Sequence, residues 1–587
     1  MQQKPIWIWA AGAVFAALVL FTALRPQGIT SSDLPRPGSP NGTIEITMTS
    51  STTKKEWLDE QVRAFNAASQ STGGVRVDNK AVLVKVLLEE LEPGRFEHYR
   101  SGTQVDDTLQ GKIKPTIVSP ADDSWIAKLR KEWTAMRRSE IATAPSTSLA
   151  RTPVVIAMWQ SRARALGCWP TPEPECTWAR IRALARSSEG WGLLGHPEWG
   201  QFKFGNTYVG VSDVGTQTAI LLCMAGIGKG GTLAIEDVDA GNGCGQAIAD
   251  VERAKVHSSK LSPWLLGLML SGGPEYLDAL TTYEKEVIAF NQANAGKLRE
   301  PVVAVYPQDG TVVVGHPMAI LDGADWVSTE QAEAARIFQT YLLSDEAQRA
   351  LPRTGMRPAN PGTPIGPPID PGYGANPAVN LVAVTVPDLP VYDRVIEVWH
   401  RVKKHAAIAL VFDKSGSMAG GKITAAVKGA QEFVRRVDRD DRIIWMPFDA
   451  TVYSPTEGYG SELGEELAQR IGSTVAGGGT SLYDAVLTAY DRLERLRRDD
   501  PTGMRYGIVV LSDGQDTNSR NGLSDLERKL RPAEGDATGI QIHTIAIGTD
   551  ADQKVLQRIA GAAHGRFWKG QTENQMVTVY QDIAAFF

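Results

Sequence analysis

One carboxylate and two hydroxyl groups stand on alternate residues of the segment Asp413-Lys414-Ser415-Gly416-Ser417. The five mostly apolar residues before it, Ile408–Phe412, are typical of a buried strand in a parallel sheet. Gly416 then allows a tight turn that a side chain would hinder. Oxygen donors packed this closely suit a small hard cation such as Mg²⁺, although such a pentapeptide is weak evidence by itself. The segment therefore predicts a metal site if the fold brings further oxygen donors to this turn.

Two later segments supply such donors. The first, Gly477-Gly478-Gly479-Thr480-Ser481, opens a helical run at Leu482–Leu496, and the second, Ser512-Asp513-Gly514, ends the apolar strand Tyr506–Leu511. With the three segments in this order, the chain from about residue 405 to its end resembles a von Willebrand factor A (VWA) domain. The resemblance implies a metal-ion-dependent adhesion site (MIDAS) in which Mg²⁺, or else Mn²⁺ or Ca²⁺, keeps one position open for an acidic residue of a partner protein. The ligands that it implies are Asp413, Ser415, Ser417, Thr480 and Asp513.

Two other interpretations of these residues are possible. Asp413 and Asp513 could simply cap turns. Gly416–Lys422 also fits the first seven positions of a phosphate-binding P-loop, but the eighth position, which should be Ser or Thr, is Ile423. A P-loop would leave Asp413 without a role, so the sequence disfavours nucleotide binding.

Length and composition narrow the class of protein. A chain of 587 residues is expected to hold more than one domain, and its 42% apolar and 22% charged content is ordinary for folded protein. The net charge of −6 and the lack of a basic block argue against nucleic-acid binding. No G-x-S-x-G or H-E-x-x-H motif occurs, so we expect a protein that is not an enzyme.

The N-terminus predicts attachment to a membrane. Residues 6–24 carry no charge and are long enough to cross a bilayer as one helix. The run lacks a good small-x-small cleavage site, which favours an uncleaved signal anchor (residues 1–25) followed by a Pro/Gly/Ser tether (26–42). We therefore expect a single-pass protein with the bulk of the chain outside the cytosol.

The four cysteines agree with an oxidising compartment. They form an even set without C-x2-C pairs or flanking histidines, so disulfides are favoured over zinc. Three pairings are possible; loop length and the Pro-rich turn WPTPEPE favour Cys168–Cys176 and Cys223–Cys244.

The first half of the chain shows one arrangement three times: a strand, a loop with hydroxyl groups, and a helix start. The loops are Ser50–Thr53, Ser119–Asp123 and Ser212–Gly215. Helix N-termini carry unpaired N–H groups and a partial positive charge, so several of them can surround a small polar ligand. The alternative is ordinary helix capping, for which Ser and Asp are the usual residues.

Residues 43–358 resemble a type II periplasmic solute-binding protein. The resemblance is carried by the segments 112–125, 196–215, 306–321 and 342–358. It implies two α/β lobes joined by crossing strands, with a ligand in the cleft between them. By position, the cleft residues that it implies are Ser50, Ser51, Ser119, Ser212 and Asp213, with Tyr306 and Asp309 as weaker candidates. Asp213 would repel an anion if it faced the cleft, which counts against a simple oxyanion ligand.

The remaining segments complete the expected organisation. Residues 359–390 belong to a Pro-rich stretch that is either a stiff linker or a strap on the domain surface. An amphipathic helix at Val391–Lys404 is assigned to the VWA domain, which would then span residues 391–587. Apolar strands at Arg442–Phe448, Tyr506–Leu511 and Ile540–Ile547 alternate with helical patterns, so a doubly wound parallel sheet is predicted.

These elements favour a membrane-anchored extracytoplasmic binding protein, whose VWA domain engages a partner protein through a bound divalent cation. A transport receptor of the ABC type with an accessory VWA domain is an alternative. An ATPase-linked chelatase or assembly factor is a third possibility, but such machines work in the cytosol, and the expected anchor and disulfides argue against it.

Overall fold

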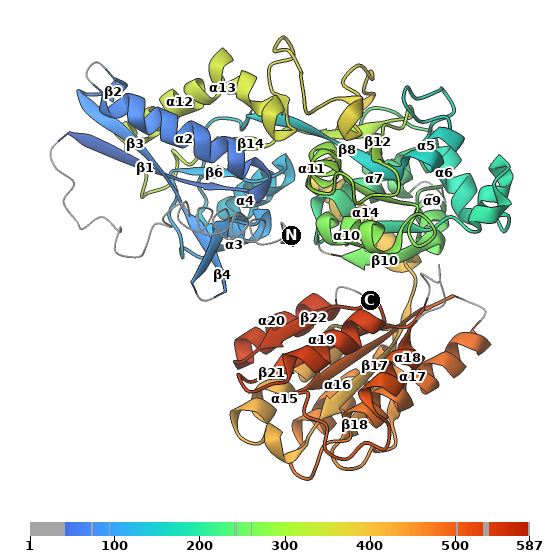
Figure 1. Ribbon diagram of the computed structural model, residues 1–587. Coiled ribbons are helices and arrows are strands. Elements are labelled where there is room, and N and C mark those ends of the chain that lie inside the picture. The colour runs from blue at the N-terminus through green and yellow to red at the C-terminus, as the bar shows by residue number, and fades with distance from the viewer. Residues whose placement is uncertain are drawn as a thin grey trace, which may run out of the picture.

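A computed structural model describes residues 42–584 except 72–73, 93, 240, 242, 260, 501–502 and 532–538. It contains a two-lobed first domain and a second domain, which lies below the second lobe in Figure 1. The predicted membrane segment, residues 6–24, lies outside the described residues. Within the described ranges, no helix is long and apolar enough to cross a membrane.

The first lobe is built on a six-stranded mixed sheet with the order β2-β3-β1-β6-β14-β7. Apolar residues alternate along β1, so that Ile44, Ile46 and Met48 face a core that also holds Trp57 and Phe65 of α2. Its strands are β1 (Thr43–Ser50), β2 (Arg76–Val77), β3 (Lys80–Val86), β6 (Ile117–Ser119), β7 (Thr147–Ser148) and β14 (Pro317–Ile320), with a separate hairpin of β4 (Leu88–Glu92) and β5 (Arg95–His98). Its helices are α2 (Lys55–Gln70), α3 (Ser101–Leu109), α4 (Asp123–Arg137), α12 (Thr329–Leu342) and α13 (Asp345–Ala350).

The second lobe is built around the long strand β8 (Ala150–Trp159), which is almost wholly buried. The chain crosses between the lobes from β7 to β8 and returns from β13 to β14, as the predicted two-lobed architecture requires. The other strands are β9 (Phe204–Thr207), β10 (Lys255–Ser259), β11 (Ala279–Tyr283), β12 (Val302–Val305), β13 (Thr311–Val314), β15 (Arg357–Pro358) and β16 (Ala383–Val384). The helices are α5 (Gln160–Ala165), α6 (Trp178–Arg186), α7 (Asp213–Ile227), α8 (Ile235–Asp239), α9 (Gly243–Ala254), α10 (Ser262–Gly272), α11 (Glu284–Ala293) and α14 (Leu389–Val402).

The Pro-rich stretch after residue 358 is a strap on the second lobe. Its residues Ile369 and Ala375 are buried against Ile288 of α11. Further along, β16 adds to the sheet beside β13, with Ala383 opposite Thr311. Of the two alternatives that the sequence left open, the structure therefore has the surface strap.

Helix α14 packs on the second lobe, although the sequence analysis assigned it to the VWA domain. Its buried residues Val391, Val395, Val398 and Trp399 belong to the same core cluster as residues of α7 and α9. Figure 1 shows the helix among the helices of that lobe. The first domain therefore extends to about residue 402, and the second begins with the following strand.

The second domain is the predicted doubly wound sheet, with the order β19-β18-β17-β20-β21-β22. All neighbouring pairs are parallel except β18 and the edge strand β19. Along β17, Ile408, Leu410 and Phe412 face one layer of helices, while Ala409 and Val411 face the other. The strands are β17 (Ala406–Asp413), β18 (Arg442–Phe448), β19 (Thr456–Tyr459), β20 (Arg505–Ser512), β21 (Gln541–Ile547) and β22 (Phe567–Gly570). The helices are α15 (Gly421–Arg436), α16 (Gly460–Gly472), α17 (Leu482–Asp499), α18 (Leu523–Leu530), α19 (Gln553–Ala562) and α20 (Glu573–Ala584).

The two domains are joined by polar contacts around a buried carboxylate, that of Glu252 on α9. Trp399 Nε1 donates a hydrogen bond of 2.8 Å to Glu252 Oε1, and Arg505 Nη2 at the start of β20 lies 3.3 Å from Glu252 Oε2. Close by, Gln541 Nε2 lies 2.7 Å from Nδ1 of His257. These contacts connect α9, α14 and the second domain at one point.

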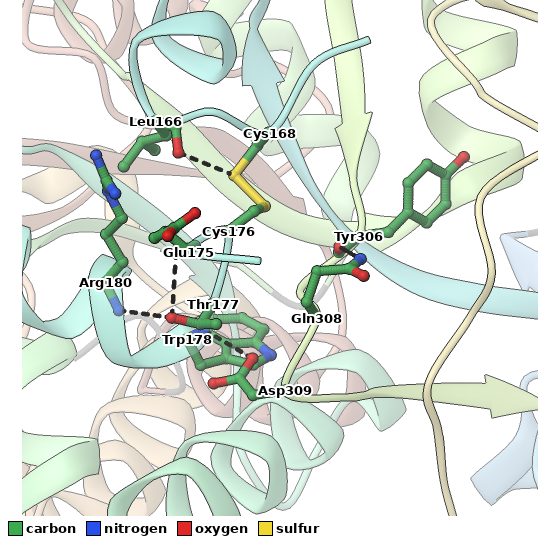
Figure 2. Close-up of a disulfide and its surroundings, with 10 residues drawn as sticks. All are labelled: Leu166, Cys168, Glu175, Cys176, Thr177, Trp178, Arg180, Tyr306, Gln308 and Asp309. Carbon is green, nitrogen blue, oxygen red and sulfur yellow. Dashed lines mark hydrogen bonds between the residues drawn. A yellow bond between two sulfur atoms is a disulfide. The ribbon is translucent and has the colours of Figure 1, made fainter. Parts of the chain in front are cut away.

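The structure contains both disulfides that the sequence predicts. Cys168–Cys176 closes a short loop with a Cα–Cα distance of 5.2 Å, and Cys223–Cys244 ties α7 to α9 with a Cα–Cα distance of 4.0 Å. Figure 2 shows the first of them beside the N-terminus of α6, where the Thr177 hydroxyl accepts a hydrogen bond from Arg180 N. Both disulfides therefore stabilise the second lobe.

Replacing Trp399 tests the position of α14. Because Trp399 is 6% exposed and packs in the core of the second lobe, we expect Trp399→Ala to destabilise the first domain by about 3–5 kcal/mol. The matched control is Arg401→Ala, two residues further along the same helix, where the side chain is exposed; it should change stability by no more than about 0.5 kcal/mol. Chemical denaturation followed by tryptophan fluorescence measures both, and equal values for the two variants would contradict the placement.

Candidate functional sites

The carboxyl ends of β17 and β20 bring the two predicted metal-binding carboxylates to one edge of the sheet. The strands are parallel neighbours with Phe412 opposite Leu511, so Asp413 ends one strand and Asp513 follows the other. Both side chains are buried, at 0% and 1% exposure. Ligands of doubly wound sheets bind at this edge, as the sequence analysis expected.

Hydrogen bonds hold Asp413 and the two serines in one orientation. Asp413 Oδ1 accepts from Ser415 N at 2.8 Å, and Asp413 Oδ2 accepts from Ser512 Oγ at 2.6 Å. The hydroxyl oxygens of Ser415 and Ser417 lie 3.1 Å apart. Ser415 is buried whereas Ser417 is exposed, so the edge opens to solvent on the Ser417 side.

The loop that carries Thr480 is fixed against the turn after β17 by the backbone. Gly416 N donates to Gly478 O at 2.9 Å, and Gly477 N donates to Lys414 O at 2.8 Å. Thr480 N donates to Thr517 Oγ1 at 2.9 Å. Thr480 itself is 4% exposed. Three separate loops thus supply the predicted donors at the same edge.

Two lysines lie close to this edge, and their side chains point in different directions. The Lys414 ammonium turns away from the serines and pairs with Asp449 beside the Tyr453 ring. The Lys422 ammonium, by contrast, lies 3.6 Å from Asp513 Oδ2 and 2.8 Å from Asp550 Oδ1. Burial raises the pKa of the Asp413 carboxyl, and the nearby Asp513 charge adds to the rise. Such a concentration of negative charge favours a cation.

In the first domain, a buried lysine lies among the predicted cleft residues Ser50, Ser51 and Ser119. Lys54 is 0% exposed, and its ammonium donates to Ser51 Oγ at 2.8 Å, Ser119 O at 3.0 Å and Pro120 O at 2.9 Å. Ser119 Oγ donates to Pro317 O at 2.6 Å. Burial, with the charge of Lys285, lowers the pKa of Lys54 to about 7. Ser50 Oγ donates to Ser51 O at 3.4 Å, so all three serines already have partners within the lobe.

The two weaker candidates also have partners within the fold. Tyr306 OH donates to Glu284 Oε1 at 2.5 Å, and Glu284 is paired with Arg357 at 2.7 Å. Asp309 accepts a hydrogen bond of 2.9 Å from Trp178 N at the start of α6, as Figure 2 shows. Tyr306 and Asp309 therefore have structural roles in the second lobe.

The other predicted cleft residues, Ser212 and Asp213, line a real cavity. It has a volume of about 200 Å³ and lies where the two lobes meet the first turns of α14. Trp125 Nε1 of the first lobe donates a hydrogen bond of 2.7 Å to Asp213 Oδ1 of the second. The cavity is lined by Ser124, Trp125, Lys128, Gly210, Val211, Ser212, Asp213, Thr216, Leu389, Tyr392, Asp393 and Ile396.

Comparison with known families agrees with this architecture. The model of a family described as bacterial extracellular solute-binding proteins matches residues 46–357, which is more than half of the chain. The protein belongs to this family. A second family model, the von Willebrand factor type A domain, matches residues 407–582. The first domain is therefore a solute-binding domain of an extracytoplasmic type, and the second is a VWA domain.

Individual relatives cover one part of the chain at a time. An uncharacterized protein of Synechocystis sp. is 27% identical over 158 residues, which is 27% of this chain and 36% of that protein. Among solved structures, a von Willebrand factor type A protein from Catenulispora acidiphila is 18% identical and covers 31% of this chain and 42% of its own, with a TM-score of 0.27. An extracellular solute-binding protein from Bordetella parapertussis is 11% identical and covers 62% of this chain and 98% of its own, with a TM-score of 0.40. The chain thus spans about a third of the curated relative in Synechocystis.

Four residues at these sites were not predicted from the sequence. Trp125 lines the cavity, and Asp122 binds Gln217 of the other lobe. Lys54 binds the predicted Ser51, and Lys422 approaches the VWA edge. Asp122 stood beside the predicted Ser119 and could have been found as the N-cap of α4, whose Ser124 N it accepts at 2.7 Å. No local pattern distinguishes Lys54 or Lys422 from a solvated lysine.

Asp213 should make the stability of the solute-binding domain depend on pH. Burial, with the charge of Asp122, raises the pKa of Asp213 to about 7, whereas an unfolded Asp titrates near about 4. The folded state therefore binds more protons between these values, so this residue's contribution to stability falls as the pH rises from about 4 to about 7. Asp213→Asn cannot ionise, and its Tm relative to wild type should rise over the same interval.

The control for this experiment is Asp393→Asn, which removes a carboxylate from the exposed rim of the same cavity. Its Tm difference from wild type should stay level between pH 4 and pH 7. Thermal denaturation at several pH values gives both curves, and a level difference for Asp213→Asn as well would show that Asp213 does not take up the proton.

Proposed function

We propose that this protein is a membrane-anchored extracytoplasmic receptor whose VWA domain engages a partner protein through a bound divalent cation. Residues 6–24 are the proposed anchor. The observation that carries the proposal is the convergence of two buried carboxylates and three hydroxyls, from three loops, at one edge of the VWA sheet. The solute-binding domain would present that edge at a fixed position through the contacts of Glu252 with Trp399 and Arg505.

The donor set fits a hard divalent cation. Asp413 and Asp513 balance the charge, and Ser415, Ser417 and Thr480 offer neutral oxygens of the kind that Mg²⁺ accepts. The hydrogen bonds from Ser415 N and Ser512 Oγ hold the Asp413 carboxylate in place, so little conformational freedom is lost on binding. A bound ion would supply an electrophilic position for a carboxylate of the partner. The exposed Ser417 marks the side from which that carboxylate would approach.

A transport receptor is the second candidate function. Membership of residues 46–357 in the solute-binding family favours it, as does the cavity between the lobes. In that case the VWA domain would dock the receptor on its membrane partner. Both candidates use the same VWA edge, and they differ in whether a captured solute is passed on.

Asp413→Ala should abolish metal-dependent association. Because the sheet core is apolar on both faces of β17, the variant should remain folded while its recovery of partner proteins falls at least tenfold. The measurement is a pull-down from solubilised membranes with Mg²⁺ and with EDTA, followed by mass spectrometry. The control Asp440→Ala removes an exposed carboxylate at the opposite edge of the sheet and should behave as wild type. Equal recovery by all three proteins under both conditions would reject the proposed role of the site.

Lys422→Gln should strengthen metal binding. The Lys422 ammonium lies 3.6 Å from Asp513 Oδ2, where two unit charges in a water-like medium interact by about 1 kcal/mol. Its removal should therefore lower the Kd for Mg²⁺ about fivefold. The matched control is Lys428→Gln on the same helix, whose ammonium pairs with Glu573 on the protein surface. Calorimetric titration with MgCl₂ measures the three proteins, and an unchanged or higher Kd for Lys422→Gln would contradict the expectation.

A further inference from the structure

Two carboxylates from opposite lobes of the solute-binding domain influence one another electrostatically, and among the described residues no basic group hydrogen-bonds to either. Asp122 precedes α4 in the first lobe, and Asp213 begins α7 in the second. In the part of the chain that the structure describes, the groups that hydrogen-bond to them are all neutral. Asp122 accepts from Ser124 N and Gln217 Nε2, each at 2.7 Å, and Asp213 accepts from Trp125 Nε1 at 2.7 Å. Asp122 is 3% exposed and Asp213 is half-buried, so the repulsion between them is relieved either by the proton that Asp213 takes up below about pH 7 or by a bound cation.

Two buried polar atoms beside these carboxylates also lack a partner among the described residues. Gln217 is 0% exposed; its amide nitrogen is bound to Asp122, while its Oε1 accepts nothing. The hydroxyl of Tyr283, which is 8% exposed, is likewise unpaired. Burial, and then the charges of Asp213 and Asp122, raise the pKa of Tyr283. Buried polar groups are normally satisfied, so the Gln217 oxygen beside Asp122 is expected to accept a hydrogen bond from a bound molecule.

The walls of the cavity suit an organic cation rather than a bare ion. Trp125 and Tyr392 contribute aromatic rings, which attract cations through their faces. The one lysine among the lining residues, Lys128, pairs with Asp106 at 3.1 Å, and its ammonium lies 5.4 Å from the centre of the Trp125 ring. The lining therefore already accommodates one ammonium beside an indole ring.

The opposite part of the cleft offers little to an anion. An ammonium group has three N–H donors, and all three of Lys54 are used by Ser51 Oγ, Ser119 O and Pro120 O. Ser119 Oγ is directed to Pro317 O. An anion in the cleft would therefore meet Asp122 and Asp213 without gaining a free donor from these groups.

We propose that the solute of this cleft is a compact organic cation, a protonated primary amine or a guanidinium, whose charged head lies between Asp122 and Asp213. The inference rests on the proposed function only in that residues 46–357 capture a solute. The N–H donors of the cation would satisfy both carboxylates and Gln217 Oε1, and its hydrocarbon part would lie against Trp125 and Tyr392. The contact between Trp125 and Asp213 bridges the lobes, so the cation enters while they are apart and is enclosed when they close.

The test uses calorimetric titration of the full-length protein with two cations, agmatine and 1,4-diaminobutane, and with glutarate and sulfate as anions. We expect at least one of the two cations to bind and neither anion to do so. Asp213→Asn should weaken cation binding at least tenfold, because it removes one of the two charges that hold the head group. The control Asp325→Asn, which removes an exposed carboxylate of the first domain outside the cavity lining, should change affinity less than twofold. The wild-type comparison of cations with anions needs no variant, so it remains decisive if Asp213→Asn fails to fold.

The outcomes separate this inference from the proposed function. Binding of an anion in place of the cations overturns the inference and leaves the protein a solute receptor. Binding of neither class overturns the inference and leaves the family membership of residues 46–357 as the support for solute capture. Cation binding that is equally strong in Asp213→Asn also overturns it, because the site would then lie elsewhere. Metal-dependent recovery of a partner through Asp413 is a separate measurement and does not depend on any of these results.

Discussion

The cost of burying a charge is the constraint on which both candidate sites depend. A charge that leaves water must be paired or fully hydrogen-bonded, and this chain meets the requirement in some places but not in others. Lys54 has an acceptor for every N–H, and Glu252 is held by Lys255, Trp399 and Arg505. These two groups are therefore structural. Asp122 and Asp213 in the cleft have neutral donors only within the described residues. A buried charge that lacks an oppositely charged partner marks a candidate ligand site, whereas a buried charge with all its partners has a structural role.

At the edge of the VWA sheet, buried carboxylates are compensated in part by a nearby ammonium group. Asp413 and Asp513 are both buried, and the ammonium group nearest to them in the described chain is that of Lys422, at 3.6 Å from Asp513. Lys422 is itself shared with Asp550, so its charge compensates Asp513 in part. A divalent ion would complete the compensation, and its binding would displace or repel this lysine. If the edge binds a metal as proposed, its affinity would be set by a competition between the ion and the Lys422 ammonium for the Asp513 carboxylate.

Sequence patterns predicted the parts of the structure that local chemistry determines. The β17 turn, the positions of Asp413 and Asp513 at the strand ends and both disulfides follow from strand alternation, turn residues and cysteine spacing. The core against which α14 packs was not predicted from the sequence. An amphipathic pattern shows that one face of a helix is buried, but it does not show against which core. Lys54 was missed for a similar reason, since its acceptors at Ser119 and Pro120 lie more than sixty residues away in sequence. The strand before α7 ends at Thr207, and an irregular turn carries the chain from there to the predicted loop at Ser212.

Helix α14 lines the cavity of the first domain near its start and shares a contact with the VWA domain near its end. Near its start, the hydroxyl of Tyr392 lies beside Ser124 of the first lobe and Thr216 of the second. Two turns later Trp399 binds the same Glu252 carboxylate that holds Arg505 of the VWA domain, and the chain then enters β17, which ends at Asp413. Separation of the lobes must therefore either remove Tyr392 from Ser124 or move α14 with the first lobe and strain its contacts at Glu252. If a solute and a VWA partner each favour one of these arrangements, linkage requires that each changes the affinity for the other by the same factor.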